Sequence, residues 1–137
     1  AAATYWSSSR AGRHSGKRRY RLMAAGAGWK GMGAETDLLV VYCTASPEEA
    51  DSLARALVEE RLAACVNIAS VRSCYIWEGK LNLDAEALLI IKTTRGRFEL
   101  LKKRIAELHS YAIPEIIALP IAEGHQPYLD WLARSVG

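Results

Sequence analysis

"DLLVVYCTASPEEADSLARALVEERL", residues 37–62, joins an apolar run to a marked helix start and determines how the following segments are interpreted. Its first part, "DLLVVYCT", is continuous, β-branched and aromatic, which is typical of a strand buried on both faces. Ser46, Pro47 and Glu49 then supply a capping residue, a proline at the first helical position and a capping box. Apolar residues recur at helical spacing from Ala50 to Leu62. The stretch therefore predicts a strand followed by an amphipathic helix.

After this unit the chain contains two long strand-like runs. Residues 64–77 are predicted to form a strand, with a bulge or bend near Ala69 and Ser70, where the alternation slips. Residues 81–94 predict a second strand with one face apolar throughout and the other polar only over its first half. The short segment between the two runs predicts a hairpin turn in which Gly79 takes a positive φ.

The last part of the chain predicts a second amphipathic helix, a short strand and a short closing helix. An apolar stripe from Phe98 to Leu108 marks the helix, which must stop before Pro114 because the residue before a proline disfavours helical backbone. "EIIALPI", residues 115–121, predicts a strand, and its proline places the strand at a sheet edge or at a strand end. The closing helix follows Pro127.

The order βαββαβ with a terminal helix predicts an α+β fold of the ferredoxin-like type. In this fold an antiparallel sheet carries both main helices on one face. The strands at 38–43, 88–91 and 116–121 are apolar on both faces, so a single copy would expose a large apolar sheet surface. We therefore expect a homo-oligomer in which neighbouring copies cover this surface.

The charges of the 137-residue chain are segregated. Residues 1–34 hold seven basic side chains and no acidic one, whereas residues 35–137 hold all 15 acidic residues. The first segment is rich in Ala, Gly, Ser and Arg and lacks an apolar period. We expect it to be a flexible basic extension, either a targeting segment or residues left over from protein expression. Residues 35–137 are expected to form the single folded domain.

The composition of residues 35–137 argues against several classes of function. This mildly acidic domain lacks the basic patch of a nucleic-acid-binding protein, and its third predicted strand lacks aromatic side chains for stacking on bases. No apolar run reaches the roughly 20 residues that span a bilayer. Three cysteines in apolar sequence favour a reducing cytoplasm over a disulfide scaffold. Because no phosphate loop, catalytic triad or zinc-binding spacing is present, we expect no enzymatic activity.

Six segments covering residues 38–133 almost without a gap are long and distinctive. They are "VYCTASPEEA", "LVEERLAACVNI", "YIWEGK", "LLIIKTT", "LHSYAIPEIIALPIAEG" and "YLDWL". In these segments, and in their order, the chain resembles the CutA divalent-cation tolerance proteins. The resemblance implies a small ferredoxin-like subunit of PII-like plan that forms a tight homotrimer, with strands of neighbouring subunits paired edge to edge.

The resemblance also implies a metal site. In bacterial members, copper and other divalent cations are associated with the Cys of the "CT" motif and with histidines that follow the second helix. By position these are Cys43 and His109, so copper or another divalent cation is the implied cofactor. Thiolate and imidazole suit Cu(I), Cu(II) or Zn. However, this chain has Leu108 where some relatives carry a second histidine, and a cysteine in an apolar strand is usually a small hydrophobe.

Further residues of the family segments combine charge with aromatic surface, namely Trp77, Lys92, Tyr111, Glu115 and Trp131. One interpretation is a cleft between subunits that binds a small polar or anionic ligand. The other is a trimer interface held by a Lys–Glu pair and packed rings. Trp77, at the hairpin end, is expected to pack against a neighbouring subunit or to line the cleft.

Three hypotheses for function follow. The first is a cytoplasmic homotrimer that binds divalent cations, copper above all, and contributes to metal tolerance. The second is a trimeric PII-like sensor or signalling module with a small ligand between its subunits and another protein as its partner. The third is a purely structural or anchoring trimer. None of the three includes a reaction, a nucleic acid or insertion into a membrane.

Overall fold

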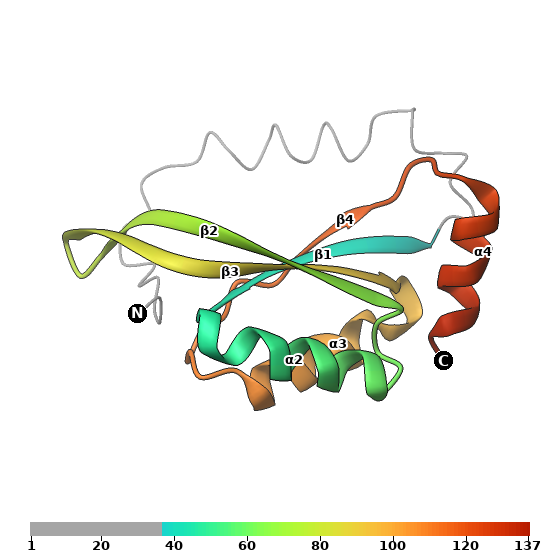
Figure 1. Ribbon diagram of the computed structural model, residues 1–137, viewed down its shortest axis with the longest axis horizontal. Coiled ribbons are helices and arrows are strands. Elements are labelled where there is room, and N and C mark those ends of the chain that lie inside the picture. Colours follow the sequence, from blue (N-terminus) through green and yellow to red (C-terminus); the bar gives the residue numbers. More distant parts are fainter. Residues whose placement is uncertain (1–36) are drawn as a thin grey trace, which may run out of the picture.

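The computed structural model describes residues 37–137, which form a four-stranded sheet with α2 and α3 on one face (Figure 1). The predicted basic extension, residues 1–34, lies outside the described residues. The elements are β1 (Leu38–Ala45), α2 (Pro47–Glu59), β2 (Cys65–Trp77), β3 (Lys80–Thr94), α3 (Arg95–Leu108), β4 (Ile117–Pro120) and α4 (Gln126–Ser135).

The strand order is β2-β3-β1-β4, and every neighbouring pair is antiparallel. This order confirms the ferredoxin-like α+β fold predicted from the sequence. The helix α4 lies at the end of the sheet that is remote from the β2–β3 turn (Figure 1). Within residues 37–137, no helix is long and apolar enough to cross a membrane.

The helix α2 begins at Pro47, as the capping sequence predicts, with Ser46 as the N-cap residue. The predicted capping box is nevertheless wrong in its hydrogen bonds, because the Ser46 side chain makes no bond to the backbone of the helix. Its hydroxyl instead donates to the Glu49 carboxylate at 2.8 Å. The Glu49 carboxylate also accepts hydrogen bonds from Ser110.

The strands β2 and β3 form one long hairpin with Glu78 and Gly79 as its turn residues. Their φ angles of 49° and 78° both lie in the left-handed region. Two such residues give the tight turn whose twist matches that of the flanking strands. The positive φ predicted for Gly79 is therefore confirmed, and Lys80 already belongs to β3, where it is paired with Trp77.

The register of the hairpin runs without interruption from Cys65 opposite Lys92 to the turn. The bulge predicted near Ala69 and Ser70 is therefore wrong. The slip in apolar alternation has another cause, since β2 is an edge strand and its two faces are both partly open to solvent. An edge strand of this kind does not need a strict alternation of apolar and polar residues.

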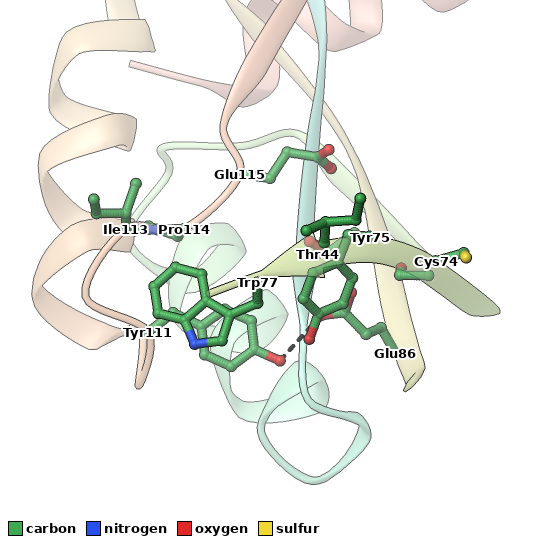
Figure 2. Close-up of a pocket in the computed structure, with 11 residues that line it drawn as sticks. Thr44, Cys74, Tyr75, Trp77, Glu86, Tyr111, Ile113, Pro114 and Glu115 are labelled. Atoms are coloured by element: carbon green, nitrogen blue, oxygen red, sulfur yellow. Dashed lines mark hydrogen bonds between the residues drawn. The ribbon is translucent and has the colours of Figure 1, made fainter. Parts of the chain in front are cut away.

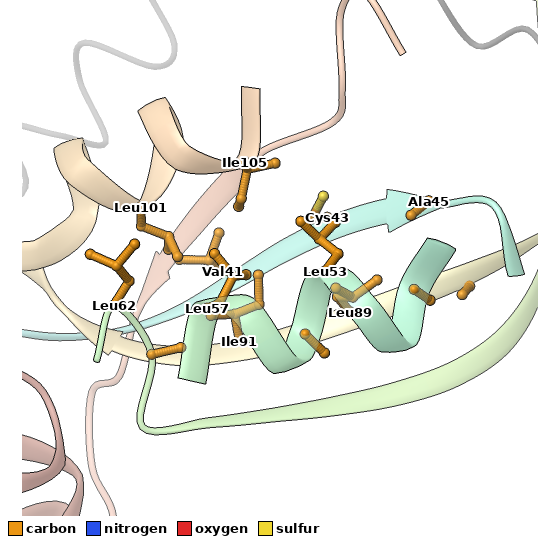
Figure 3. Close-up of a cluster of buried hydrophobic side chains, with 14 of the residues drawn as sticks. Val41, Cys43, Ala45, Leu53, Leu57, Leu62, Leu89, Ile91, Leu101 and Ile105 are labelled. Carbon is orange, nitrogen blue, oxygen red and sulfur yellow. The ribbon is translucent and has the colours of Figure 1, made fainter. Parts of the chain in front are cut away.

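The core lies between the sheet and the two helices α2 and α3 (Figure 3). Side chains from one face of β1 and β3 meet the apolar stripes of both helices, which is the arrangement their periodicity predicts. The largest fully buried apolar side chains of this cluster are Leu57, Leu89, Ile91, Leu101, Ile105 and Val41. A smaller cluster around Leu132 holds α4 against the sheet.

The end of the β2–β3 hairpin extends beyond α2 and α3 (Figure 1). As a result, the apolar face of β3 is covered only from Ala87 onward, where the helices lie over it. Closer to the turn, Ile76, Leu81 and Leu83 are 65%, 74% and 60% exposed. The chain therefore presents an apolar surface at the hairpin end that its own helices do not cover.

Candidate functional site

The two predicted metal ligands, Cys43 and His109, approach the same carbonyl oxygen, that of Thr44. The Cys43 thiol contacts this oxygen at 3.7 Å, and His109 Nε2 lies 2.8 Å from it. The fold thus brings together two residues that are far apart in the sequence, one near the end of β1 and the other directly after α3.

The surroundings of Cys43 favour the neutral thiol. The side chain is fully buried in the core between the sheet and the helices. Burial, together with the nearby carboxylates of Glu115, Glu49 and Glu86, raises the thiol pKa to about 12. A metal ligand must be the thiolate. Cys43 is therefore a neutral thiol near pH 7, and it would have to lose its proton in order to bind a metal.

The ring nitrogens of His109 both have partners. Nε2 lies 2.8 Å from the Thr44 carbonyl, and Nδ1 accepts the backbone N–H of Tyr111 at 3.0 Å. This pair of contacts fits a neutral ring with its proton on Nε2. Nδ1 also lies 3.4 Å from a Glu49 oxygen. This contact would be an ion pair only if Nδ1 carried a proton. A protonated Nδ1 could not accept the hydrogen bond from the Tyr111 N–H.

These contacts do not fit a metal centre in the described chain. Across residues 37–137 there is no group of three or more His, Cys, Asp or Glu side chains placed to hold a metal ion. Burial also differs from the sequence-based expectation, because Leu108 is exposed whereas His109 is buried. Copper binding at Cys43 and His109 stays a prediction, and it would require the thiol to ionise and the ring to leave the Thr44 carbonyl.

Glu49 links the start of α2 to the segment that follows α3. Its carboxylate accepts the Ser110 backbone N–H at 3.1 Å and the Ser110 hydroxyl at 2.5 Å, in addition to the Ser46 hydroxyl. Partial burial acts to raise the pKa of Glu49, but the hydrogen bonds from Ser110 and Ser46 lower it overall. The charged carboxylate therefore fixes residues 109–111 against α2.

The segment held by Glu49 forms one wall of a cavity of about 460 Å³, which we call the tyrosine pocket (Figure 2). The other walls come from the end of β1 and from the hairpin half of β2 and β3. The residues that line the tyrosine pocket are Thr44, Ser73, Cys74, Tyr75, Ile76, Trp77, Glu86, Tyr111, Ile113, Pro114 and Glu115.

Two tyrosine–carboxylate hydrogen bonds fix the phenol groups of the tyrosine pocket. Tyr111 donates to Glu86 Oε2 at 3.0 Å, and Tyr75 donates to Asp84 Oδ2 at 2.5 Å (Figure 2 shows the Tyr111–Glu86 bond). The bond to Asp84 and partial burial raise the pKa of Tyr75 to about 12. Burial and the bond to Glu86 raise the pKa of Tyr111 as well. Both phenols are thus protonated donors near neutral pH.

The tyrosine pocket carries negative charge. Glu86 and Glu115 are the charged residues of its lining, which includes no Lys, Arg or His. Glu86 is only 4% exposed. Partial burial, and then the charge of Glu86, raise the pKa of Glu115, and no basic side chain of the lining offsets this effect.

Within one chain, the five residues predicted for a cleft between subunits fall into two groups. Trp77, Tyr111 and Glu115 all line the tyrosine pocket. Lys92 and Trp131 do not belong to that lining. The sequence alone could not show this separation, because the presence of a residue in a family segment does not say which other residues line the same pocket.

Lys92 and Trp131 lie near the opposite end of the hairpin, where β2 begins. The Lys92 ammonium hydrogen-bonds the Asn67 side chain and lies 3.7 Å from the Cys65 thiol. The Trp131 ring on α4 packs at 5.4 Å from the ring of Tyr128. Within one chain, the predicted Lys–Glu pair is therefore not formed.

The sequence did not identify Glu86, Tyr75 and Thr44 as members of a site. Glu86 was interpreted as the last polar residue on one face of β3, yet it is buried. The sequence feature that could have identified Glu86 was its position, because it lies where that face of β3 changes from polar to apolar. A carboxylate next to an apolar run is a candidate for a buried, partnered group.

The family model of the CutA1 divalent ion tolerance protein matches residues 38–135. The chain belongs to the CutA1 family. Residues of the matched range supply both the tyrosine pocket and the Cys43–His109 pair. The resemblance inferred from the sequence is thereby confirmed.

Individual CutA1 relatives are similar over most of the described range. The divalent-cation tolerance protein CutA of Thermus thermophilus is 52% identical over 100 residues, which are 72% of this chain and 97% of the relative. The chloroplastic protein CutA of Arabidopsis thaliana is 48% identical over 99 residues, 71% of this chain and 54% of the relative.

Solved CutA structures share the fold. The Thermus thermophilus protein superimposes with a TM-score of 0.70 at 53% identity, covering 73% of this chain and 99% of its own. The PII-like protein CutA from Nostoc gives a TM-score of 0.70 at 34% identity, covering 72% and 97%. A CutA relative from Archaeoglobus fulgidus is described as periplasmic and the Arabidopsis one as chloroplastic, so the cytoplasmic location stays a prediction for this chain.

Proposed function

We propose that this CutA1-family protein takes part in divalent-cation tolerance, and that it acts as a homotrimer that senses a small ligand in the tyrosine pocket. The observation that carries the proposal is the pocket itself, which has a volume of about 460 Å³. Apolar walls with a few fixed polar groups are typical of small-molecule sites. The names of the relatives support the role in tolerance, and the PII-like description of the Nostoc protein supports ligand sensing. No reaction is part of this proposal.

The homotrimer is supported by the apolar surface at the hairpin end. Ile76, Leu81 and Leu83 would remain in water in a single copy, and the edge strand β4 adds the exposed side chains Ile117 and Leu119. Burial of apolar surface drives association at about 25 cal/mol per Å². Sedimentation velocity of the full chain is expected to give a trimer, and a monomer at micromolar concentration would contradict the proposed assembly.

A small-molecule screen by thermal unfolding tests the ligand site. A ligand that binds only the folded protein raises the unfolding midpoint, and the rise grows with ligand concentration. Trp77→Ala removes a pocket wall and should abolish the rise given by any hit. Trp131→Ala is the matched control, because Trp131 is also a partly exposed indole but lies outside the pocket. The ligand site would be refuted if both variants lost the ligand-induced rise equally, or if Trp77→Ala kept it.

Direct copper binding at Cys43 and His109 is the second candidate. The observation in its favour is their shared contact with the Thr44 carbonyl, which places sulfur and imidazole nitrogen near one oxygen. Calorimetric titration with Cu²⁺ should then show weaker binding in Cys43→Ala/His109→Ala. The double variant Cys74→Ala/His125→Ala, at an exposed thiol and an exposed histidine, serves as control. Unchanged affinity in the first variant would remove this site.

A further inference from the structure

We propose that the ligand of the tyrosine pocket is a small organic ammonium cation that carries an apolar body. This inference rests on the proposed function, since it names the chemical class of the molecule that the pocket senses. It also departs from the sequence-based interpretation of the cleft, in which a polar or anionic ligand was expected.

The charge of the lining gives the first reason. Glu86, which is almost fully buried, and Glu115 both line the pocket, while this chain contributes no basic side chain to the lining. The hydrogen bond from Tyr111 satisfies one oxygen of Glu86 but brings no positive charge. A buried carboxylate is stabilised most by a cation close to it. An anion in the same place would meet two like charges.

The aromatic walls give the second reason. Tyr75, Trp77 and Tyr111 all contribute rings to the lining (Figure 2). The faces of such rings attract an ammonium group through their quadrupole, and Trp is the strongest of them. Ile76, Ile113 and Pro114 complete an apolar surface on which the body of the ligand can pack. Rings, carboxylates and apolar walls together match an organic cation.

The spacing of the acidic groups argues against a bare metal ion as the pocket ligand. Nowhere in the described range 37–137 do three or more His, Cys, Asp or Glu side chains lie close enough to hold a metal ion. Ca²⁺, for example, takes about six to eight oxygen ligands, several of them carboxylate or carbonyl oxygens of the protein. An ammonium needs only a few acceptors and a surface for its carbon atoms. The acidic pair thus fits the organic cation better.

Calorimetric titration of the full chain with three matched probes tests the inference. The probes are 2-phenylethylammonium, uncharged 2-phenylethanol and anionic phenylacetate, which share a phenyl body and differ in charge. The ammonium is expected to bind more tightly than the other two. Glu115→Gln removes one charge at an exposed position and should weaken ammonium binding by about tenfold, with little change for the alcohol. Glu123→Gln, an exposed carboxylate outside the pocket, should bind like wild type.

The outcomes separate the inference from the proposed function. If phenylacetate or the alcohol binds as well as the ammonium and Trp77→Ala abolishes that binding, the pocket is a ligand site but the ammonium inference is wrong. Equal effects of Glu115→Gln and Glu123→Gln on ammonium binding would also overturn the inference. If none of the three probes binds, both the inference and the ligand-sensing pocket lose their support.

Discussion

Replacing Tyr111 with phenylalanine removes one hydroxyl group and keeps the ring. The ring packs at 4.6 Å from that of His109, a contact that phenylalanine preserves. The lost hydroxyl is the donor to Glu86, at 3.0 Å. The variant therefore isolates the hydrogen bond between the segment after α3 and the middle of β3.

The loss of stability expected for Tyr111→Phe follows from the burial of Tyr111 and Glu86. Glu86 is 4% exposed and Tyr111 is 5% exposed, so water has little access to the carboxylate once its donor is gone. Leaving a buried acceptor without a partner costs about 1–3 kcal/mol, and more when the group is charged. We expect Tyr111→Phe to lower the free energy of unfolding by about 2–3 kcal/mol at pH 7.

Tyr75→Phe is the matched control, since it removes a phenol–carboxylate hydrogen bond on the same sheet face. Asp84 is only partly buried, so water can replace the lost donor, and we expect a cost below about 1 kcal/mol. Urea unfolding of both variants at one fixed protein concentration measures the two costs, because subunit association also contributes to stability. A cost for Tyr111→Phe no larger than that for Tyr75→Phe would refute the reasoning about the buried carboxylate.

Two further predictions concern titration and thiol reactivity. Because the folded-state pKa of Glu49 is below its ordinary value of 4.5, its charge stabilises the fold above that pH and loses this effect as the pH falls through the lower value. Urea unfolding of Glu49→Gln should show a loss of roughly 1 kcal/mol at pH 7 that disappears in acid, and a pH-independent difference would contradict this sign. Cys43, with its pKa near 12, should resist iodoacetamide at pH 8, whereas the exposed Cys74 reacts; peptide mass spectrometry after alkylation distinguishes the two thiols.

The fold could be predicted from the sequence because local signals agree with one another. The apolar stripe of residues 47–62, the continuous strand before it and the Gly79 turn each point to the same order of elements. The predicted bulge failed because an edge strand tolerates irregular alternation. The burial of His109 in place of Leu108 was also missed. Helix α3 ends at Leu108, so His109 leaves the helical period and turns toward Thr44.

The candidate site was predicted only in part, since its walls come from four separate segments. Trp77, Tyr111 and Glu115 recur in family segments and could be marked in advance. Their meeting with Glu86 depends on the register of β3 and on the Glu49 carboxylate, which holds the segment after α3 in place. This tether has no sequence signal of its own, because it arises from tertiary packing.

The most direct test of the central claim is a crystal structure of the full chain grown with a small molecule that raises its unfolding midpoint. The tyrosine pocket is predicted to hold that molecule, with its contacts made to Trp77, Tyr111 and Glu115 of at least one subunit. The ligand site would be contradicted if the molecule were bound elsewhere or if side chains of a neighbouring subunit filled the pocket.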